Sequence, residues 1–584
     1  MKLSDYVVDF LVNNRVTHVF EICGGALTHI LDSMYERPDI YCVSMHHEQA
    51  AAFAAEGYAR AGNRLGVAMA TSGPGATNLI TGIGSCFFDS TSCMFLTGQV
   101  NTYEFKGQST VRQVGFQETD IVEIVKPIVK YAVMVNDPET IRYHLEKAVF
   151  LATGGRPGPV LLDIPMNVQR AEIQPDKLEG FEPSGDDVRP VLETAAVGRI
   201  ADALRNAKRP VIISGGGVGA SDARDELLAV AEKTGVPVVT SLLGRDTCPS
   251  DHPAFSGMIG TYGHRFANLT VANADLVVAI GTRLDTRQTG TDPATFARGA
   301  VFVHVDIDQA ELGYKVPADI TLQADAKEFL NALDDTLDGL NKAALSEWSS
   351  TIAGWKARYP VIEDVPNDGI HPSALFKQVT QLLPDEAIVC ADVGQNQMWA
   401  AQAAVIRRGQ RFITEGGMGA MGSSLALAVG ASYARPGRII VALTGDGGFQ
   451  LNIQELETIK HHNLPIKLVM VNNGCYGMVR QFQEQYFESR YQSTVVGYSC
   501  PDFQAVVAAY GIRSTLIEKA GEIKTAVQEL LLDSLPHFVE ASIDRSIQIL
   551  PKLGMGRPVE DQDPPLSREQ LKQEMIIDML DERD

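Results

Sequence analysis

Hydrophobic positions along the chain follow one repeated pattern. Short runs of apolar and β-branched residues alternate with longer stretches in which apolar residues recur at helical spacing. This alternation is typical of parallel sheets covered by helices, so the pattern predicts an α/β protein. No repeat of fixed period is visible, which argues against a solenoid or a propeller.

The pattern divides the chain into three α/β units and a tail. The expected strands are His18–Ile22, Tyr41–Met45, Gly66–Thr71, Met94–Thr97 and Val160–Ile164 in the first unit, Pro210–Ser214, Asp275–Gly281 and Val301–Asp306 in the second, and Ala387–Ala391, Arg438–Thr444, Ile466–Val471 and His537–Ala541 in the third. Polar stretches at Gln174–Pro190 and Lys342–Asp368 separate the units, with one boundary near Arg189. The predicted domains are residues 1–175, 190–345 and 369–550, and the tail at 551–584 carries no motif that we can interpret.

Composition limits the classes of protein that fit. At roughly 150 residues per domain, 584 residues suffice for three or four domains. The formal net charge of −22 argues against nucleic acid as a partner, because an acidic surface repels phosphates. No uncharged apolar run is long enough for a membrane helix, and Asp5 and Asp9 interrupt any signal segment. The eight cysteines form no CxxC pair, so we expect a cytoplasmic protein.

The clearest chemical signal lies at the ends of two expected strands in the third unit. Gly445-Asp446-Gly447-Gly448 follows one strand, and Asn472-Asn473-Gly474 follows the next. Ligands bind where parallel strands end, and the oxygen atoms of Asp and Asn suit Mg²⁺, which usually completes its shell with phosphate and water. Either segment alone is typical of an ordinary turn, but the two together predict a diphosphate held through a metal.

The two segments resemble the cofactor motif of thiamine diphosphate (ThDP) enzymes. The resemblance implies that Mg²⁺ is bound by the side chains of Asp446 and Asn473 and by the main-chain carbonyl of Cys475. A ThDP enzyme also needs a carboxylate facing N1′ of the aminopyrimidine as a general acid–base. Glu48 fits this role because it opens an alanine-rich helix where it can be buried. The alternative for Glu48 is an acidic residue that favours the helix dipole.

Longer segments narrow the resemblance to the acetolactate synthase family. They are EGYAR at 56–60, TSGPGATN at 71–78, LTGQV at 96–100, FQE at 116–118, GRPGPVLLDIP at 155–165, VGQNQMWAAQ at 393–402 and the run at 449–467. The similarity extends from about Asp5 to about Ile543. It implies a decarboxylating carboligase that converts two molecules of pyruvate, a 2-oxo acid, into 2-acetolactate and CO₂.

The same resemblance assigns further residues to the cofactor. Phe116 and Gln117 lie beside its reactive end, and Met421 supports its bent conformation rather than serving only as a core methionine. The other implied ThDP contacts are Pro74, Asn78, Gly394, Gln395, Gly445, Gly447, Gly448 and Met478. Active sites of this superfamily combine two subunits, and Glu48 and Asp446 lie on different domains. We therefore expect a homodimer or homotetramer.

The middle unit resembles the FAD-binding domain of acetolactate synthases. The segments that carry this resemblance are Ser214–Ala220, Gly257–Gly260, Gly281–Arg287 and His304–Asp308. They imply that Arg283 contacts the flavin nucleotide and that Gly216 and Asp306 lie near its phosphates and ribose. A glycine-rich turn alone is weak evidence, so a nucleotide domain that is empty or holds ADP stays open as the alternative.

Four departures from the family pattern affect the substrate pocket. Phe482 replaces a tryptophan that discriminates the larger second keto acid, which leaves a preference for 2-oxobutyrate open. Asn396 stands where histidine is usual, and Ala420 where threonine is common. The loop at Ile22–Ala26, with Gly25 near the substrate, also differs from the usual sequence.

Three alternatives to acetolactate synthesis follow. A related carboligase would use an aldehyde or a keto-sugar as acceptor, and the changes at Phe482 and Cys23 favour it. A pyruvate oxidase-like enzyme would pass electrons to the flavin. A non-enzymatic scaffold would lack Glu48, Asp446 or Asn473, and all three are present. The sequence does not determine the acceptor or whether a regulatory subunit exists.

Overall fold

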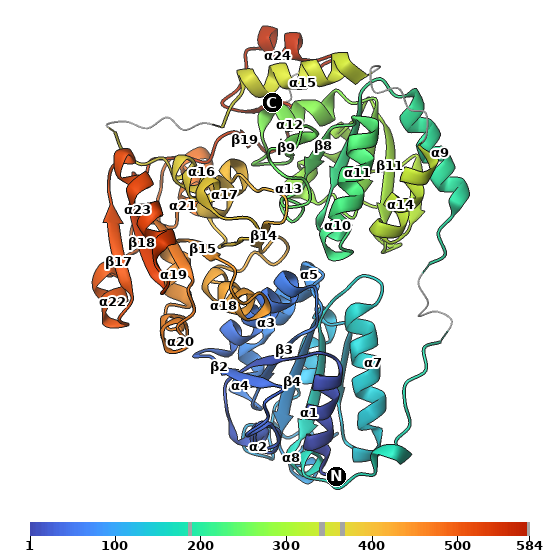
Figure 1. Cartoon of the computed structure of the whole chain (residues 1–584), viewed down its shortest axis with the longest axis vertical. Coiled ribbons are helices and arrows are strands. Elements are labelled where there is room, and N and C mark those ends of the chain that lie inside the picture. The colour runs from blue at the N-terminus through green and yellow to red at the C-terminus, as the bar shows by residue number, and fades with distance from the viewer. Residues whose placement is uncertain (185–189, 338–344, 362–367, 581–584) are drawn as a thin grey trace.

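The structure is a computed structural model that describes residues 1–184, 190–337, 345–361 and 368–580 (Figure 1). Three six-stranded sheets follow one another along the chain, and the strands within each sheet pair in parallel. Helices flank the sheets, so the predicted α/β class is confirmed. The expected boundary near Arg189 lies outside the described residues.

The first unit contains the sheet with strand order β2-β1-β3-β4-β6-β5. Its strands are β1 (His18–Glu21), β2 (Tyr41–Ser44), β3 (Gly66–Ala70), β4 (Cys93–Gln99), β5 (Tyr131–Met134) and β6 (Val160–Pro165). Its helices are α1 (Leu3–Asn13), α2 (Thr28–Met34), α3 (Glu48–Gly62), α4 (Pro74–Asn78), α5 (Ile80–Phe88), α6 (Ile121–Val125), α7 (Ile141–Thr153) and α8 (Met166–Gln169). The central strands β3, β4 and β6 are buried along their whole length, which explains their nearly continuous apolar sequences.

The middle unit contains the sheet with strand order β12-β11-β10-β7-β8-β9. Its strands are β7 (Pro210–Ser214), β8 (Val238–Thr240), β9 (Phe255–Met258), β10 (Leu276–Ile280), β11 (Val301–Asp306) and β12 (Ile320–Gln323). Its helices are α9 (Thr194–Asn206), α10 (Gly216–Ala220), α11 (Arg224–Thr234), α12 (Arg265–Ala272), α13 (Thr286–Thr289) and α14 (Ala326–Thr336). The glycine-rich segment Ser214–Ala220 singled out in the sequence comprises the end of β7, the turn at Gly215 and the whole of α10.

The third unit contains the sheet with strand order β14-β13-β15-β16-β18-β17, the same order as the first sheet when each is counted from its own first strand. Its strands are β13 (Ile388–Ala391), β14 (Arg411–Thr414), β15 (Ile440–Gly445), β16 (Lys467–Asn472), β17 (Arg513–Ile517) and β18 (His537–Ser542). Its helices are α16 (Pro372–Leu382), α17 (Gln395–Ala403), α18 (Ser424–Ala434), α19 (Asp446–Leu451), α20 (Glu455–His461), α21 (Gly477–Tyr486), α22 (Phe503–Ala509) and α23 (Ile523–Leu532).

Every strand expected from the sequence is present, but six other strands of the three large sheets were missed. They are β5, β8, β9, β12, β14 and β17. All except β8 lie at a sheet edge, where one side of the strand has no neighbour. Edge strands such as β5 and β12 are only partly buried, so their sequences lack the continuous apolar run that identifies a central strand.

The first and third units meet through α3 and α18 at very close range (Figure 1). A Cβ atom on Gly57 of α3 would lie 2.2 Å from the carbonyl oxygen of Leu427, and one on Gly430 of α18 would lie 1.9 Å from that of Ala54. Only glycine permits this approach of two backbones. The alanine-rich faces of both helices are buried in one continuous core.

The tail and the polar stretch before the third unit pack together on the middle unit (Figure 1). Part of that stretch forms α15 (Ser346–Arg358), which the sequence pattern did not predict, and the tail adds β19 (Lys552–Leu553), β20 (Gln562–Asp563) and α24 (Arg568–Glu574). Glu574 accepts hydrogen bonds from Trp355 at 2.7 Å, Arg358 at 2.6 Å and Tyr359 at 2.7 Å.

Among the described residues, no helix has the length and apolar character needed to cross a membrane.

Candidate active site

A cavity of about 430 Å³ lies at the carboxyl edge of the third sheet. Segments that follow the neighbouring strands β13, β15 and β16 form most of its wall. The structure brings ten of the predicted residues together there: Gly394, Gln395, Met421, Gly445, Asp446, Gly447, Gly448, Asn473, Cys475 and Met478. Parallel strands that neighbour each other end at the same edge, which is why residues far apart in sequence share this cavity.

Asp446 and Asn473 provide the oxygen atoms of this cavity that suit a hard cation. Asp446 is 3% exposed, and the hydroxyl of Tyr498 donates to its Oδ2 at 2.6 Å. Burial raises the pKa of Asp446 to about 6, against the opposing hydrogen bond from Tyr498. Asn473 donates through Nδ2 to Gln395 Oε1 at 3.2 Å, and its Oδ1 accepts from the main-chain N–H of Cys475 at 3.2 Å.

The described side chains of this cavity are too few to hold a metal ion without further ligands. Among the described residues, no cluster of three or more His, Cys, Asp and Glu side chains could hold a metal ion. Packing within the protein requires glycine at both positions, since a Cβ on Gly447 would lie 2.7 Å from the Tyr476 ring and one on Gly448 2.7 Å from Asp392.

The predicted residues of the first unit gather at the carboxyl edge of its sheet. Glu48 begins α3 directly after the β2 turn, and Asn78 Nδ2 donates to its Oε2 at 2.9 Å. A Cβ on Gly73 would lie 3.0 Å from Gln117, which places Gln117 against the turn that leads to Pro74. Gly25 follows β1 at the same edge.

These first-unit residues lie on an open surface in the single chain. Phe116 is 86% exposed, Pro74 and Asn78 are exposed, and Glu48 is half-buried rather than buried as its helix sequence predicts. None of these residues lines the 430 Å³ cavity. The two sets of predicted residues thus form two separate half-sites.

A second cavity of about 740 Å³ lies where the three units meet. Gly216, Arg283 and Asp306, the predicted nucleotide contacts, all line it. Burial raises the pKa of Asp306 to about 6 although the main-chain N–H of Asp308 donates to it at 2.9 Å. The first unit contributes Arg156 to the wall and the third unit contributes Met398 and Gly416, among other residues.

Comparisons with known proteins cover nearly the whole chain. Residues 1–124 match the N-terminal TPP binding domain of thiamine pyrophosphate enzymes, residues 197–333 their central domain and residues 392–541 their C-terminal TPP binding domain. The chain is 36% identical to the probable acetolactate synthase large subunit of Methanocaldococcus jannaschii, over 95% of this chain and 94% of that protein. It is 38% identical to the acetolactate synthase large subunit of Corynebacterium glutamicum, over 93% and 87%. It is 36% identical to the acetolactate synthase isozyme 2 large subunit of Escherichia coli, over 95% and 98%.

The chain belongs to the acetolactate synthase large-subunit family of thiamine pyrophosphate enzymes. The resemblance inferred from its motifs is confirmed. ThDP is accordingly a cofactor of this protein, and both TPP binding domains carry one of the half-sites described above.

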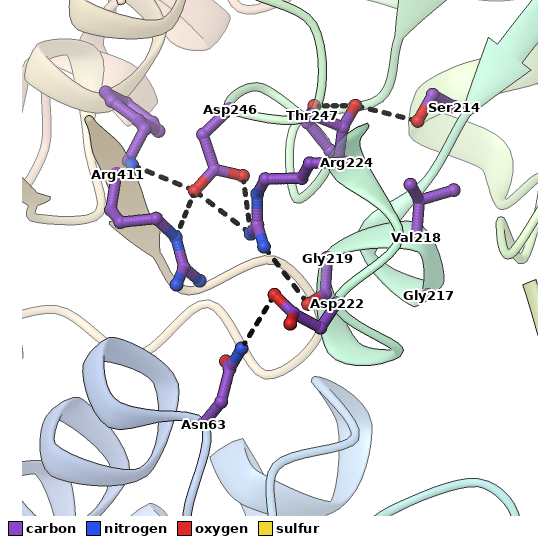
Figure 2. A network of polar contacts seen from close by, with 12 residues as sticks. Asn63, Ser214, Gly217, Val218, Gly219, Asp222, Arg224, Asp246, Thr247 and Arg411 are labelled. Atoms are coloured by element: carbon purple, nitrogen blue, oxygen red, sulfur yellow. Dashed lines mark hydrogen bonds and ion pairs between the residues drawn. The ribbon is translucent and has the colours of Figure 1, made fainter. Parts of the chain in front are cut away.

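Sequence reasoning missed three polar residues that link the middle domain of this acetolactate synthase-family chain to its third domain (Figure 2). Asp246 accepts from Arg224 of the middle domain at 3.1 Å and from Arg411 of the third domain at 2.7 Å. Arg224 also donates to the carbonyl of Gly219 at 3.2 Å, in the glycine-rich turn. Burial opposes ionisation of Asp246, but the two guanidinium groups lower its pKa to about 2. No local motif predicts these contacts, because Arg224, Asp246 and Arg411 are far apart in the sequence.

Sequence reasoning also missed residues that support the 430 Å³ cavity from behind. Gln481 of α21 accepts from Gln395 Nε2 at 3.0 Å, and Tyr498 donates to Asp446 as described. Gln481 adjoins Phe482 in the segment at 480–483 that resembles a family motif, but the resemblance assigned it no role, and Tyr498 belongs to no motif that we recognised. Their roles become visible only when the ends of β13, β15 and β16 are brought together.

Asp246→Asn should lower the free energy of unfolding by about 3 kcal/mol at pH 7, since it leaves two largely buried guanidinium groups without a carboxylate. Urea unfolding measures this value. Because the pKa of Asp246 is lowered from its usual 3.8 to about 2, its contribution is fully present above pH 4 and declines as the pH falls towards 2.

The matched control is Asp225→Asn, which removes a surface ion pair with Arg408. The side chains of Asp225 and Arg408 are 74% and 68% exposed. We expect a loss of under about 1 kcal/mol from this control. Equal losses of unfolding free energy from both substitutions would contradict the conclusion that Asp246 stabilises the contact between the middle and third domains.

Proposed function

We propose that the protein is a ThDP- and Mg²⁺-dependent acetolactate synthase, which joins two pyruvate molecules into 2-acetolactate and releases CO₂. The observation that carries this proposal is the presence of two complementary half-sites, one around Glu48 and one around Asp446 and Asn473. Relatives that are 36–38% identical are named acetolactate synthases. Bound ThDP supplies the carbanion chemistry needed for decarboxylation and carbon–carbon bond formation.

The third domain would bind the diphosphate end of the cofactor. Asp446 and Asn473 would hold Mg²⁺ through their side-chain oxygens, and Cys475 through its main-chain carbonyl. Tyr498 keeps Asp446 in place by a 2.6 Å hydrogen bond, and Gln395 does the same for Asn473 at 3.2 Å. These partners fix the ligand oxygens before a metal arrives, which lowers the entropic cost of binding.

The first domain would act on the aminopyrimidine end of the cofactor. Glu48 would hold and release the proton at N1′, and Asn78 fixes one oxygen of its carboxylate. Pro74 and Asn78 would contact the cofactor from the adjacent turn. Phe116 and Gln117 would lie beside the reacting carbon, where Gln117 can donate hydrogen bonds and Phe116 can exclude water.

A second copy of the chain would complete each active site. The half-site around Glu48 is open, and the nearby apolar side chains of Tyr103, Val114 and Phe116 are 70%, 59% and 86% exposed. A homodimer or homotetramer would place the third domain of one subunit over this surface of the next. The relatives are named large subunits, so association with a smaller subunit is also part of the proposal.

The 740 Å³ cavity would bind FAD. Its glycine-rich turn, the polar side chains of Arg283 and Asp306, and its volume suit a dinucleotide.

The domain bounds that we propose are 1–175, 190–345 and 369–550, with the tail at 551–584. A cytoplasmic location agrees with eight cysteines that are all free thiols.

A carboligase with a different acceptor is the second candidate. Phe482 of α21 is 41% exposed and packs against Tyr486 and Phe487, at ring-centroid distances of 4.8 and 5.8 Å. Phe482 does not line the 430 Å³ cavity of the single chain, but a phenylalanine in place of the family's tryptophan would leave more room for an acceptor at the exposed surface of α21. An aldehyde or keto-sugar would then replace the second pyruvate.

The decisive experiment is anaerobic incubation of the purified protein with ThDP, Mg²⁺, FAD and pyruvate. We expect 2-acetolactate to form in step with CO₂ while the flavin spectrum stays oxidised. Bleaching of the flavin would indicate pyruvate oxidase-like chemistry. CO₂ without acetolactate would favour the carboligase with another acceptor, which a panel of aldehydes and keto-sugars then identifies.

Glu48→Gln should retain the fold and ThDP binding but lower kcat by at least about 100-fold, the typical contribution of a positioned acid–base group. Steady-state kinetics and a ThDP titration measure the two effects separately. The control is Glu123→Gln, which changes an exposed carboxylate on α6 that pairs with Lys126 at the surface. Full activity in the Glu48 variant would show that another group handles the proton.

Asp446→Ala should weaken ThDP binding in a way that depends on Mg²⁺, because it removes a metal ligand. The measurement is a series of ThDP titrations at increasing Mg²⁺ concentration. Coexpression with the Glu48→Gln chain should restore part of the activity, since a mixed dimer contains one intact pair of half-sites. Unchanged cofactor affinity would refute the metal site, and no restoration would refute the intersubunit arrangement.

A further inference from the structure

The exposed loop that carries Phe116 and Gln117 is organised around a single buried carboxylate. Glu118 is 6% exposed, while the side chains at 107–114 are exposed. Its Oε1 accepts from the main-chain N–H of Lys106 at 2.6 Å. Its Oε2 accepts from those of Val114 at 2.6 Å and Gly115 at 3.2 Å. One side chain therefore holds both ends of the exposed stretch together.

Glu118 is suited to this task only as an anion. Burial opposes its ionisation, but the three main-chain donors outweigh that effect and lower its pKa. A carboxylate offers acceptor sites on both oxygens. A glutamine at this position would direct an NH₂ group at one set of N–H donors and leave those donors unsatisfied.

A second anchor holds the residue that follows Glu118. Gln99 of β4 donates through Nε2 to the carbonyl of Thr119 at 2.8 Å and to Asp163 Oδ2 of β6 at 2.8 Å. Asp163 also accepts from the hydroxyl of Thr97 at 2.7 Å. These buried groups fasten the end of the loop to the two central strands of the first sheet.

Gln117 lies between these anchors in an unusual backbone conformation. Its φ angle is +64°, a left-handed value that residues with a side chain seldom adopt. Such a conformation persists only when its surroundings enforce it, and it occurs most often at functional sites. Here the enforcing contacts are those of Glu118 and Thr119, together with the close approach of Gly73 to Gln117.

We propose that Glu118 is a positioning residue for the carboligase reaction, which presents Phe116 and Gln117 to the reacting carbon in a fixed geometry. Glu118 touches neither substrate nor cofactor and acts through the main chain of the loop. This inference rests on the proposed function, because it is the proposed role of Gln117 that gives the loop geometry a catalytic value. A misplacement of about 1 Å in such a residue can cost on the order of 100-fold in rate.

The test is Glu118→Gln in the holoenzyme, with two readouts. We expect kcat/KM for pyruvate to fall at least about tenfold with unchanged ThDP affinity. We also expect faster trypsin cleavage after Lys106 or Arg112, which lie on the loop, because the exposed stretch loses its anchor. Glu118→Asp keeps the charge, so we expect its kcat/KM and its resistance to trypsin to lie between those of the unmodified enzyme and Glu118→Gln. The same two measurements on Glu118→Asp test the proposal if Glu118→Gln does not fold.

The matched control is Glu104→Gln in the same loop, whose carboxylate accepts from the main-chain N–H and the side chain of Asn101 at 3.1 and 2.7 Å. We expect Glu104→Gln to change kcat/KM and the rate of trypsin cleavage less than Glu118→Gln does. An unchanged trypsin rate or an unchanged kcat/KM in Glu118→Gln overturns the proposal, as do equal effects from both variants. Absence of pyruvate turnover in the unmodified enzyme would instead refute the proposed function, while the trypsin rates still report on the anchor.

Discussion

The close crossing of α3 and α18 is the contact on which the arrangement of the two TPP binding domains depends. Gly57 and Gly430 let the two helices approach until carbonyl oxygens of one lie against the glycine of the other. Helix α3 begins at Glu48, and α18 begins shortly after Met421. The crossing therefore fixes the direction in which each half-site faces, and any residue larger than glycine at either position would push the domains apart.

Buried charges join the middle domain to the third domain. Asp246 links Arg224 to Arg411 across the domain boundary. The neighbouring Arg245 donates to the carbonyl of Ala401 at 2.8 Å, near the end of α17, the helix whose first turn lines the ThDP cavity. Burial lowers the pKa of Arg245 to about 10. Helix α17 borders both cavities, since Met398 lines the one of about 740 Å³ and Gln395 the one of about 430 Å³.

Much of the fold and of the site could be predicted because the informative residues are local. Gly445–Gly448 and Asn473 follow central strands, where continuous apolar runs make the strand ends easy to place. Edge strands such as β5 and the helix α15 were missed because their burial depends on partners far away in the chain. Trp348 and Trp355 of α15 are buried only where the tail and the middle domain meet. Glu118 belongs to the recognised segment FQE at 116–118, but its hydrogen bonds to the main chain of the loop became visible only in the folded structure.

The sequence by itself determined the α/β class and the family, because short motifs at strand ends require particular residue types at particular spacings. Only the tertiary structure decided which of these residues share a cavity. It showed that Glu48 does not line the cavity that contains Asp446, that Asp246 accepts a hydrogen bond from Arg411, 165 residues away, and that Glu118 joins the two ends of one loop. The physical reason is that burial and hydrogen-bond partners are properties of the folded chain, which no local pattern of residues encodes.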